Sequence, residues 1–267
     1  METRLFLNIL CIISYMAGYK AYLSDISNLQ LDRLILDAQE SHHLCRVLRA
    51  SKGSLVEIFD GKGCIYETKL LIADSKSAEL EVMDKKAYPL PETELVLLIC
   101  VPKPKAMDQI LKHAVEIGIQ TIIPVFSEHS AFVLNSDKTE AKLNKWQSTL
   151  VESCKQSGCP ILPEMNIPVS LNQFFSKYES DWKQDALGFV ASLESGADLL
   201  LNGLEGVYKR QKKIIYAVGP EGDFSKNEYE IFEGLGFIST RLGSYVLRSE
   251  TAVTYGISVI DQFIKSR

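Results

Sequence analysis

Several patterns that mark common protein classes are missing from the sequence. Its six cysteines include no C-x-x-C pair, which argues against a zinc site, a disulfide framework and an oxidising compartment. Neither G-x-G-x-x-G after a predicted strand nor G-x-x-x-x-G-K-S/T occurs, so the standard dinucleotide-binding and P-loop classes are unsupported. We therefore expect a protein of the reducing cytoplasm that holds no metal ion.

Charge and hydropathy bear on nucleic-acid binding and on membrane association. The chain has 29 Lys and Arg against 34 Asp and Glu, a net charge of −5, which excludes a generally basic nucleic-acid coat but leaves room for a local cationic face. The apolar stretch Leu5–Ala17 is shorter than the roughly 20 residues that span a bilayer, and no membrane association is expected. We interpret residues 1–18 as an apolar extension of unclear role: a signal-peptide core, a buried segment, or an extension upstream of a start at Met16.

Two regions of the remaining chain differ in their hydrophobic pattern. Residues 19–88 have short alternating apolar runs, typical of a small antiparallel sheet or barrel, with one helical stretch at Ala38–Arg49. Within this region, Asp60–Gly63 supplies a turn between two such runs, which predicts a hairpin. Residues 89–267 alternate helical stretches with buried strands, which predicts an α/β domain with a mostly parallel sheet. The predicted strands are Leu95–Val101, Thr121–Phe126, Leu187–Ala191 and Ile214–Val218.

A glycine-containing loop follows the last of these strands. It reads Gly219-Pro220-Glu221-Gly222-Asp223-Phe224-Ser225, and Ser225 with Glu228 predicts a capping box that fixes the start of the next helix. Glycines let the backbone approach a ligand, and free N–H groups in such a loop can bind a polar group. An ordinary strand-to-helix turn is the alternative interpretation.

A second segment, Leu242–Ala252, enters the apolar C-terminal helix. Two apolar stripes on that helix predict that it packs both on its own domain and on a partner. Arg248, Glu250 and Thr251 lie at the start of the helix, either as functional groups or as a charge arrangement that suits the helix dipole. In the first region Arg46, Arg49 and Lys52 follow each other at intervals of three, which predicts a cationic helix face that contacts phosphates or is simply solvated.

The order and spacing of these segments resemble the ribosomal RNA small subunit methyltransferase E family over about Tyr19 to Lys265. The most specific part is the pair formed by Gly-Pro-Glu-Gly at 219–222 and Leu-Arg-Ser-Glu-Thr-Ala at 247–252. The other matching motifs are His43-x-x-Arg46-Val47-Leu48-Arg49, Asp60-Gly61-Lys62-Gly63-x-x-Tyr66, Met107-Asp108-x-Ile110-Leu111, Glu116-Ile117-Gly118, Ser127-Glu128-His129-Ser130, Lys142-Leu143-x-x-x-Trp146 and Gln156-Ser157-Gly158.

The resemblance implies a fold, a reaction and partners. Residues 19–88 would form a PUA-like RNA-binding β-barrel, and residues 89–267 a SPOUT methyltransferase domain with a C-terminal trefoil knot, a parallel sheet flanked by helices. The family uses S-adenosylmethionine (SAM) to methylate N3 of a uridine in 16S rRNA of the small ribosomal subunit. It forms homodimers through the C-terminal domain.

The resemblance also assigns the cofactor contacts, which would be Leu193, Gly219, Pro220, Glu221, Gly222, Leu242, Gly243, Val246, Leu247, Arg248 and Thr251. Because the uracil N3 proton must leave during methylation, we hypothesise that Arg248, Glu221 and Glu250 are catalytic, with Arg248 stabilising the uracil oxygens or a phosphate and one of the two glutamates accepting the N3 proton. The cationic triplet Arg46, Arg49 and Lys52 would bind RNA.

The sequence departs from the family pattern at several positions. Asp223 replaces a glycine, Ser244 and Tyr245 replace the usual Pro and Arg, and Cys159 and His129 stand where Arg is common. The lost cations weaken the expected RNA-binding face. Two alternatives therefore accompany the methyltransferase interpretation: a catalytically silent RNA-binding or ribosome assembly factor, and a SPOUT methyltransferase with another RNA target.

Overall fold

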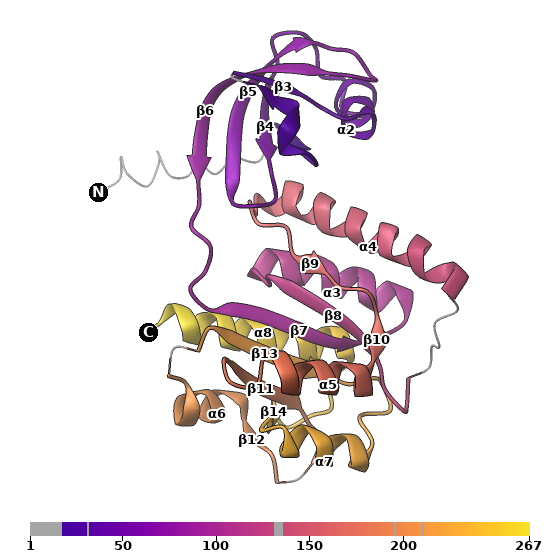
Figure 1. Ribbon diagram of the computed structural model, residues 1–267, viewed down its shortest axis with the longest axis vertical. Helices are drawn as coiled ribbons and strands as arrows, with labels where there is room; N and C mark the ends of the chain where they lie inside the picture. The colour runs from indigo at the N-terminus through magenta and orange to yellow at the C-terminus, as the bar shows by residue number, and fades with distance from the viewer. Residues whose placement is uncertain (1–17, 31, 131–135, 195, 210) are drawn as a thin grey trace. The chain divides into compact units, whose positions relative to one another are not determined.

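The computed structural model describes residues 18–30, 32–130, 136–194, 196–209 and 211–267 (Figure 1). The predicted apolar extension, residues 1–18, lies outside the described residues except for Gly18. The chain divides into two compact units between Leu90 and Pro91. Across the described ranges, no helix is both long enough and apolar enough to cross a membrane.

The first unit contains one six-stranded sheet in the order β1-β4-β5-β6-β3-β2. The predicted hairpin is confirmed, because β4 and β5 pair antiparallel and the Asp60 carboxylate accepts hydrogen bonds from the turn N–H groups of Lys62 and Cys64 at 2.8 and 2.9 Å. The sheet is not wholly antiparallel as expected, since β1 pairs parallel to β4. The strands are β1 (Tyr19–Tyr22), β2 (Leu29–Gln30), β3 (Arg33–Ile35), β4 (Leu55–Phe59), β5 (Cys64–Ile72) and β6 (Glu79–Ala87).

The helical stretch of this unit is shorter and less regular than predicted. The α-helix α2 (Ala38–His42) continues as a π-helix, η2 (His43–Val47), and a 3-10 turn η1 (Ile26–Asn28) precedes both. Arg49 then has a left-handed backbone with φ 59°, and Lys52 lies in the following turn. The prediction that the three cations share one helix face is therefore wrong, because the wider π turn and the chain reversal at Arg49 change the spacing on which it depended.

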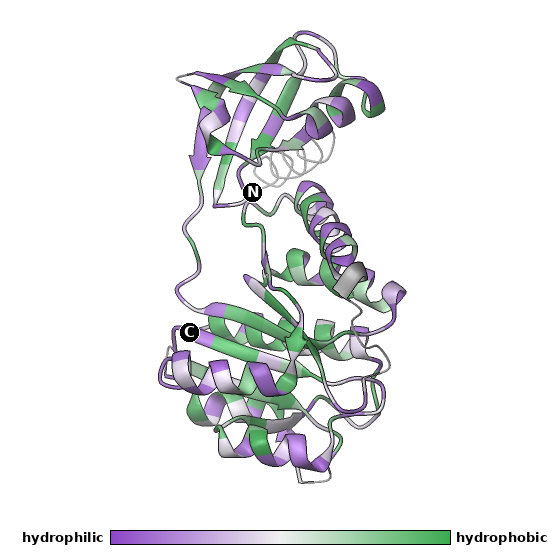
Figure 2. Ribbon diagram, turned by 45° about the vertical axis from the view of Figure 1, so that its right-hand side comes forward, coloured by the Kyte–Doolittle hydropathy of each residue, from purple (hydrophilic) through white to green (hydrophobic). Residues whose placement is uncertain are grey.

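The second unit is built on a parallel sheet in the order β10-β8-β7-β13-β11-β14-β12, with β9 paired to β8. Every pair in this sheet is parallel, as the alternating pattern predicted. The strands are β7 (Glu94–Cys100), β8 (Thr121–Phe126), β9 (Glu164–Met165), β10 (Val169–Ser170), β11 (Ala186–Ala191), β12 (Asp198–Leu199), β13 (Lys213–Val218) and β14 (Ile238–Arg241). Figure 2 shows the apolar colouring along β7, which is buried on both faces.

Helices cover both faces of this sheet. Aromatic and leucine side chains from α5 and α7 form one core with Val96, Leu98 and Ile215 of the strands. On the other face α8 contacts α3, α6 and β13, and α4 packs on α3. The helices are α3 (Pro104–Ile117), α4 (Ser136–Ser157), α5 (Leu171–Asp181), α6 (Leu200–Val207), α7 (Lys226–Gly234) and α8 (Ser249–Lys265). The predicted glycine cap is confirmed at the end of α3, where Gly118 has φ 104°.

The C-terminal helix α8 runs antiparallel to the strands beneath it (Figure 1). Near its end, the ring of Phe263 lies 5.3 Å from that of Tyr208, just before β13 begins. Near its start, the carbonyl of Ala252 accepts a hydrogen bond from the buried Tyr216 hydroxyl, two residues before β13 ends. The start of α8 therefore lies at the carboxyl edge of the sheet, where ligands bind in open α/β folds. The trefoil knot itself stays a prediction.

Candidate functional site

Three loops leave the carboxyl edge of the sheet side by side. Strand β11 pairs with both β13 and β14, so the segments that follow them, which begin at Ser192, Gly219 and Leu242, start from neighbouring strands. The Ser192 N–H donates to the Thr240 carbonyl at 2.9 Å, which joins the first of these loops to the strand before the third. The two sequence motifs, separated by more than twenty residues, thus share one edge with the start of α8.

The loop after β13 is held in shape by Asp223. Its backbone N–H donates to the Pro220 carbonyl at 3.0 Å, and its φ of 60° is left-handed. Its Oδ1 accepts hydrogen bonds from the Phe224 N–H at 2.8 Å and the Tyr229 hydroxyl at 2.7 Å. Asp is one of the few residues besides glycine that adopts this conformation readily. The Asp223 side chain therefore bonds within its own loop and to α7.

The Tyr229 hydroxyl links this loop to β11. Besides Asp223, it lies 3.1 Å from the carbonyl oxygen of Ala191. Burial raises the pKa of Tyr229 well above its usual range, so the hydroxyl remains a protonated donor. A single hydroxyl therefore connects the ends of two neighbouring strands, a contact between residues that are 38 apart in the chain.

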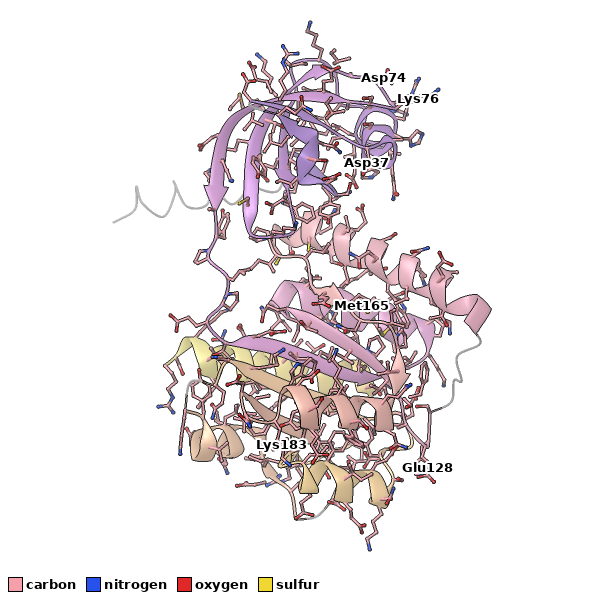
Figure 3. The ribbon with its side chains drawn as sticks, viewed as in Figure 1. Asp37, Asp74, Lys76, Glu128, Met165 and Lys183 are labelled. Carbon is pink, nitrogen blue, oxygen red and sulfur yellow. The ribbon has the colours of Figure 1, made fainter. Side chains whose placement is uncertain are left out.

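A fourth loop, which follows β8, packs against the glycine-containing loop. The predicted capping box at Ser225 and Glu228 is confirmed. The buried Glu228 carboxylate has a second role: it accepts one hydrogen bond from the Ser225 N–H and another from the Glu128 N–H, both at 2.8 Å. Figure 3 shows Glu128 at the carboxyl end of the sheet and Lys183, which precedes β11, toward the other end. Sequence reasoning found the cap but not this cross-link, because only the fold brings residues 100 apart together.

Glycines allow close packing at this junction. A Cβ on Gly219 would lie 3.2 Å from the Phe224 ring, and one on Gly222 would lie 3.4 Å from the Cβ of His129. The His129 ring nitrogen Nδ1 is 3.1 Å from the Asp223 carbonyl oxygen. His129, where the family commonly has Arg, thus packs against the loop after β13.

Large apolar side chains on the other two loops are uncovered. Tyr245 is 86% exposed, Val246 76% and Leu193 59%. Leu242 and Leu247 are half-buried, and Gly243 between them is exposed. Exposed apolar groups gathered beside a glycine-containing loop are typical of a surface that a ligand covers.

Charged groups flank these loops without partners among the described residues. Arg248 is exposed, precedes the first residue of α8, and its side chain makes no hydrogen bond or ion pair with any residue placed by the structure. Glu221 and Thr251 are exposed, and Glu250 is half-buried in the first turn of α8. A cation and two carboxylates are therefore available at the edge for proton transfer and charge stabilisation.

The other predicted residues lie in the first unit. Arg46, Arg49 and Lys52 are all exposed, although they share no helix face. No group of three or more His, Cys, Asp or Glu side chains that could hold a metal ion occurs in the described part of the chain.

Comparison with known proteins supplies the family. A profile of the RNA methyltransferase domain matches residues 89–261, and one of the RNA methyltransferase PUA domain matches residues 36–83. The ribosomal RNA small subunit methyltransferase E of Aquifex aeolicus is 32% identical over 239 residues, which cover 86% of this chain and 94% of that protein. This chain belongs to the ribosomal RNA small subunit methyltransferase E family.

A further relative and two solved structures are similar to this chain. The Synechocystis methyltransferase E is 28% identical over 86% of this chain and 73% of that protein. Two solved structures have the same fold: the Neisseria gonorrhoeae methyltransferase E bound to S-adenosyl methionine (TM-score 0.80, 24% identity) and a Legionella pneumophila methyltransferase in complex with SAM (TM-score 0.81, 22% identity). Each alignment covers 92% of this chain and 98% of the other. The predicted fold class, a parallel α/β sheet flanked by helices and preceded by a PUA-like domain, and the predicted enzyme class, an rRNA methyltransferase, are confirmed.

Proposed function

We propose that this methyltransferase transfers the methyl group of SAM to N3 of a uridine in the 16S rRNA of the small ribosomal subunit. Family membership supports the rRNA methyltransferase activity, and the N3 position rests on the motif resemblance. One structural observation carries the proposal: the Gly219–Gly222 loop and Arg248 share the carboxyl edge of one parallel sheet.

The residues at this edge fit the cofactor. SAM has a flat adenine ring whose faces suit apolar contacts, together with polar ribose and amino-acid groups. The edge offers exposed apolar side chains at Leu193 and Val246 and an exposed glycine, Gly222, in the loop after β13. Asp223 stays out of the way because its carboxylate is bound within the loop. The proposed cofactor contacts are Leu193, Gly219, Pro220, Glu221, Gly222, Leu242, Gly243, Val246, Leu247, Arg248 and Thr251.

When bound, SAM supplies a methyl group on a positively charged sulfur. The chain's own residues position the uracil in line with it, which is the main source of acceleration in such a displacement. The N3 proton must leave, and negative charge then spreads onto the uracil oxygens. Arg248 stabilises that charge, and Glu221 or Glu250 accepts the proton.

The proton acceptor is identified by comparing two matched variants. Glu221→Gln and Glu250→Gln each remove one carboxylate at nearly constant volume. In single-turnover methylation with SAM in excess, the true acceptor's variant slows by about 10²–10⁴-fold and its rate loses a step in the pH profile. Arg248→Ala slows the same step by about 10²–10³-fold, as expected when a charge-stabilising donor is lost. Full single-turnover rates in Arg248→Ala and in both glutamine variants would refute these roles.

RNA binding is assigned to the cations of the first unit. Arg46, Arg49 and Lys52 are exposed and would contact backbone phosphates from separate positions rather than from one helix face. Each lost phosphate contact reduces the slope of log affinity against log salt by about 0.7–0.9. Binding of small subunits by Arg46→Ala and Lys52→Ala variants at several salt concentrations measures this, and unchanged slopes would exclude both residues.

A homodimer through the C-terminal domain in the cytoplasm completes the proposal. It is supported by the exposed part of the second apolar stripe of α8, where Tyr255 is 50% exposed; Ala252 and Phe263 of the same stripe are buried within the chain's own domain. Light scattering of the whole chain tests the dimer, and Tyr255→Glu should shift it toward monomer because a charge would be buried at the interface.

The decisive experiment is methylation of small ribosomal subunits with labelled SAM, followed by mapping of the modified base. Label on N3 of one uridine supports the proposal. Label at another RNA position indicates a methyltransferase with a different target. SAM binding by calorimetry without transfer to RNA, or no SAM binding at all, indicates a silent RNA-binding or assembly factor.

A further inference from the structure

A pair of cysteines lies at the end of α4, away from the site described above. Cys154 is in the last turn of the helix, and Cys159 follows Gly158, whose φ of 74° is left-handed. The Gly158 N–H donates to the Cys154 carbonyl at 2.8 Å. A left-handed residue after a helix turns the chain back along the last turn, and this turn brings the two cysteines together.

The two thiols converge on one carbonyl. Sγ of Cys159 is 3.2 Å and Sγ of Cys154 is 3.7 Å from the carbonyl oxygen of Ile161. Cys154 is buried, whereas Cys159 is partly exposed to solvent. One thiol is thus reachable by a small reagent, and its neighbour lies against the same carbonyl oxygen.

The two thiols also differ in pKa. The neighbouring Cys154 thiol lowers the pKa of Cys159 to about 7, and the Cys159 thiol together with burial raises the pKa of Cys154. By contrast, burial raises the pKa of Cys100 to about 12 and also raises that of Cys45. Because the thiolate is the reactive form, Cys159 is the more nucleophilic member of the pair at neutral pH.

We propose that Cys154 and Cys159 form a reversible oxidation site that takes a hydroperoxide as oxidant and a dithiol as reductant. The Cys159 thiolate attacks one peroxide oxygen, the O–O bond breaks, and a sulfenic acid and hydroxide form. The Cys154 sulfur then attacks the sulfenic sulfur and water leaves, so two thiols lose two electrons and the peroxide becomes two waters. A dithiol returns the disulfide to two thiols by exchange.

This site is separate from the proposed methyl-transfer site. Ile161 precedes β9, whose first residue pairs with Thr121 at the amino end of β8, whereas the methyl-transfer loops leave the carboxyl edge. The inference therefore does not rest on the proposed function. Its outcome can be read by mass alone, whether or not the protein methylates RNA.

The test treats the reduced full chain with hydrogen peroxide at neutral pH, blocks remaining thiols with N-ethylmaleimide and digests with trypsin. Cleavage after Lys155 separates the two cysteines, so a disulfide leaves peptides Trp146–Lys155 and Gln156–Lys177 joined. We expect this joined pair, with a loss of two hydrogens in mass, and its disappearance after dithiothreitol. Two separately alkylated peptides after peroxide treatment would overturn the proposal.

Variants separate the roles of the two thiols. In Cys154→Ala, Cys159 should stop at a sulfenic acid that dimedone traps, whereas Cys159→Ser should leave Cys154 unmodified. Cys64→Ser is the matched control, since Cys64 is another partly exposed thiol outside the pair, and it should form the joined peptides like the parent. Equal or faster modification of Cys64 than of Cys159 in the parent chain would also overturn the proposal.

Discussion

Asp223 offers the sharpest test of how the loop after β13 is held. The family usually has glycine at this position, yet the backbone keeps the left-handed φ of 60°. The carboxylate compensates by accepting hydrogen bonds from the Phe224 N–H and the Tyr229 hydroxyl. Replacing Asp223 thus changes two opposing terms, backbone strain and side-chain hydrogen bonding.

The hydrogen-bond term and the backbone-strain term differ in their expected free energies. Hydrogen bonds to a charged group contribute about 1.5–3 kcal/mol each, and the lower value applies here because Asp223 is only half-buried and Tyr229 can turn to the Ala191 carbonyl. A left-handed conformation costs a residue with a Cβ about 1 kcal/mol more than glycine. We expect Asp223→Ala to lower the free energy of unfolding by about 2–3 kcal/mol, and Asp223→Gly by about 1 kcal/mol less.

Scanning calorimetry of thermal unfolding measures these differences in the free energy of unfolding. For a protein of this size, each kcal/mol corresponds to roughly 2–4 °C in Tm. Tyr229→Phe should destabilise by about 1–2 kcal/mol, and the double variant with Asp223→Ala should show a coupling energy of about 1 kcal/mol. If the alanine and glycine variants unfold at the same temperature, or the double variant is strictly additive, the account of this loop is wrong.

Two further predictions concern packing and the junction between loops. Gly256→Ala would place a Cβ 2.2 Å from the ring of the buried Tyr216, so we expect a loss of about 1–3 kcal/mol in chemical denaturation, whereas Gly206→Ala, where nothing lies within 4 Å, should be neutral or stabilising by up to about 1 kcal/mol. Stability as low in the control as in Gly256→Ala would contradict the packing argument. Glu228→Gln sets an amide against two backbone N–H donors and should cost about 2–3 kcal/mol, while the exposed Glu230→Gln should stay within about 0.5 kcal/mol of the parent. Equal unfolding midpoints for these last two variants would show that the Glu228 carboxylate does not hold the loops together.

The sequence alone determined the features that depend on neighbours in the chain. Seven consecutive apolar residues at Leu95–Val101 predicted a strand covered on both faces, and β7 confirms it. The capping box at Ser225 and Glu228 and the cap at Gly118 were likewise predicted correctly. These signals are reliable because hydrophobic period and capping act over only a few residues.

Only the tertiary structure decided which distant groups meet. The regular period at Ala38–Arg49 favoured a single helix, but burial of Leu44 in the core accompanies a π turn and a reversal at Arg49. Likewise, Asp223 departs from the family pattern in the sequence, and its partner Tyr229 and the second bond of Glu228 to the β8 loop emerge only from packing. The physical reason is that strand order and side-chain contacts minimise the free energy of the whole fold, and local patterns carry little information about either.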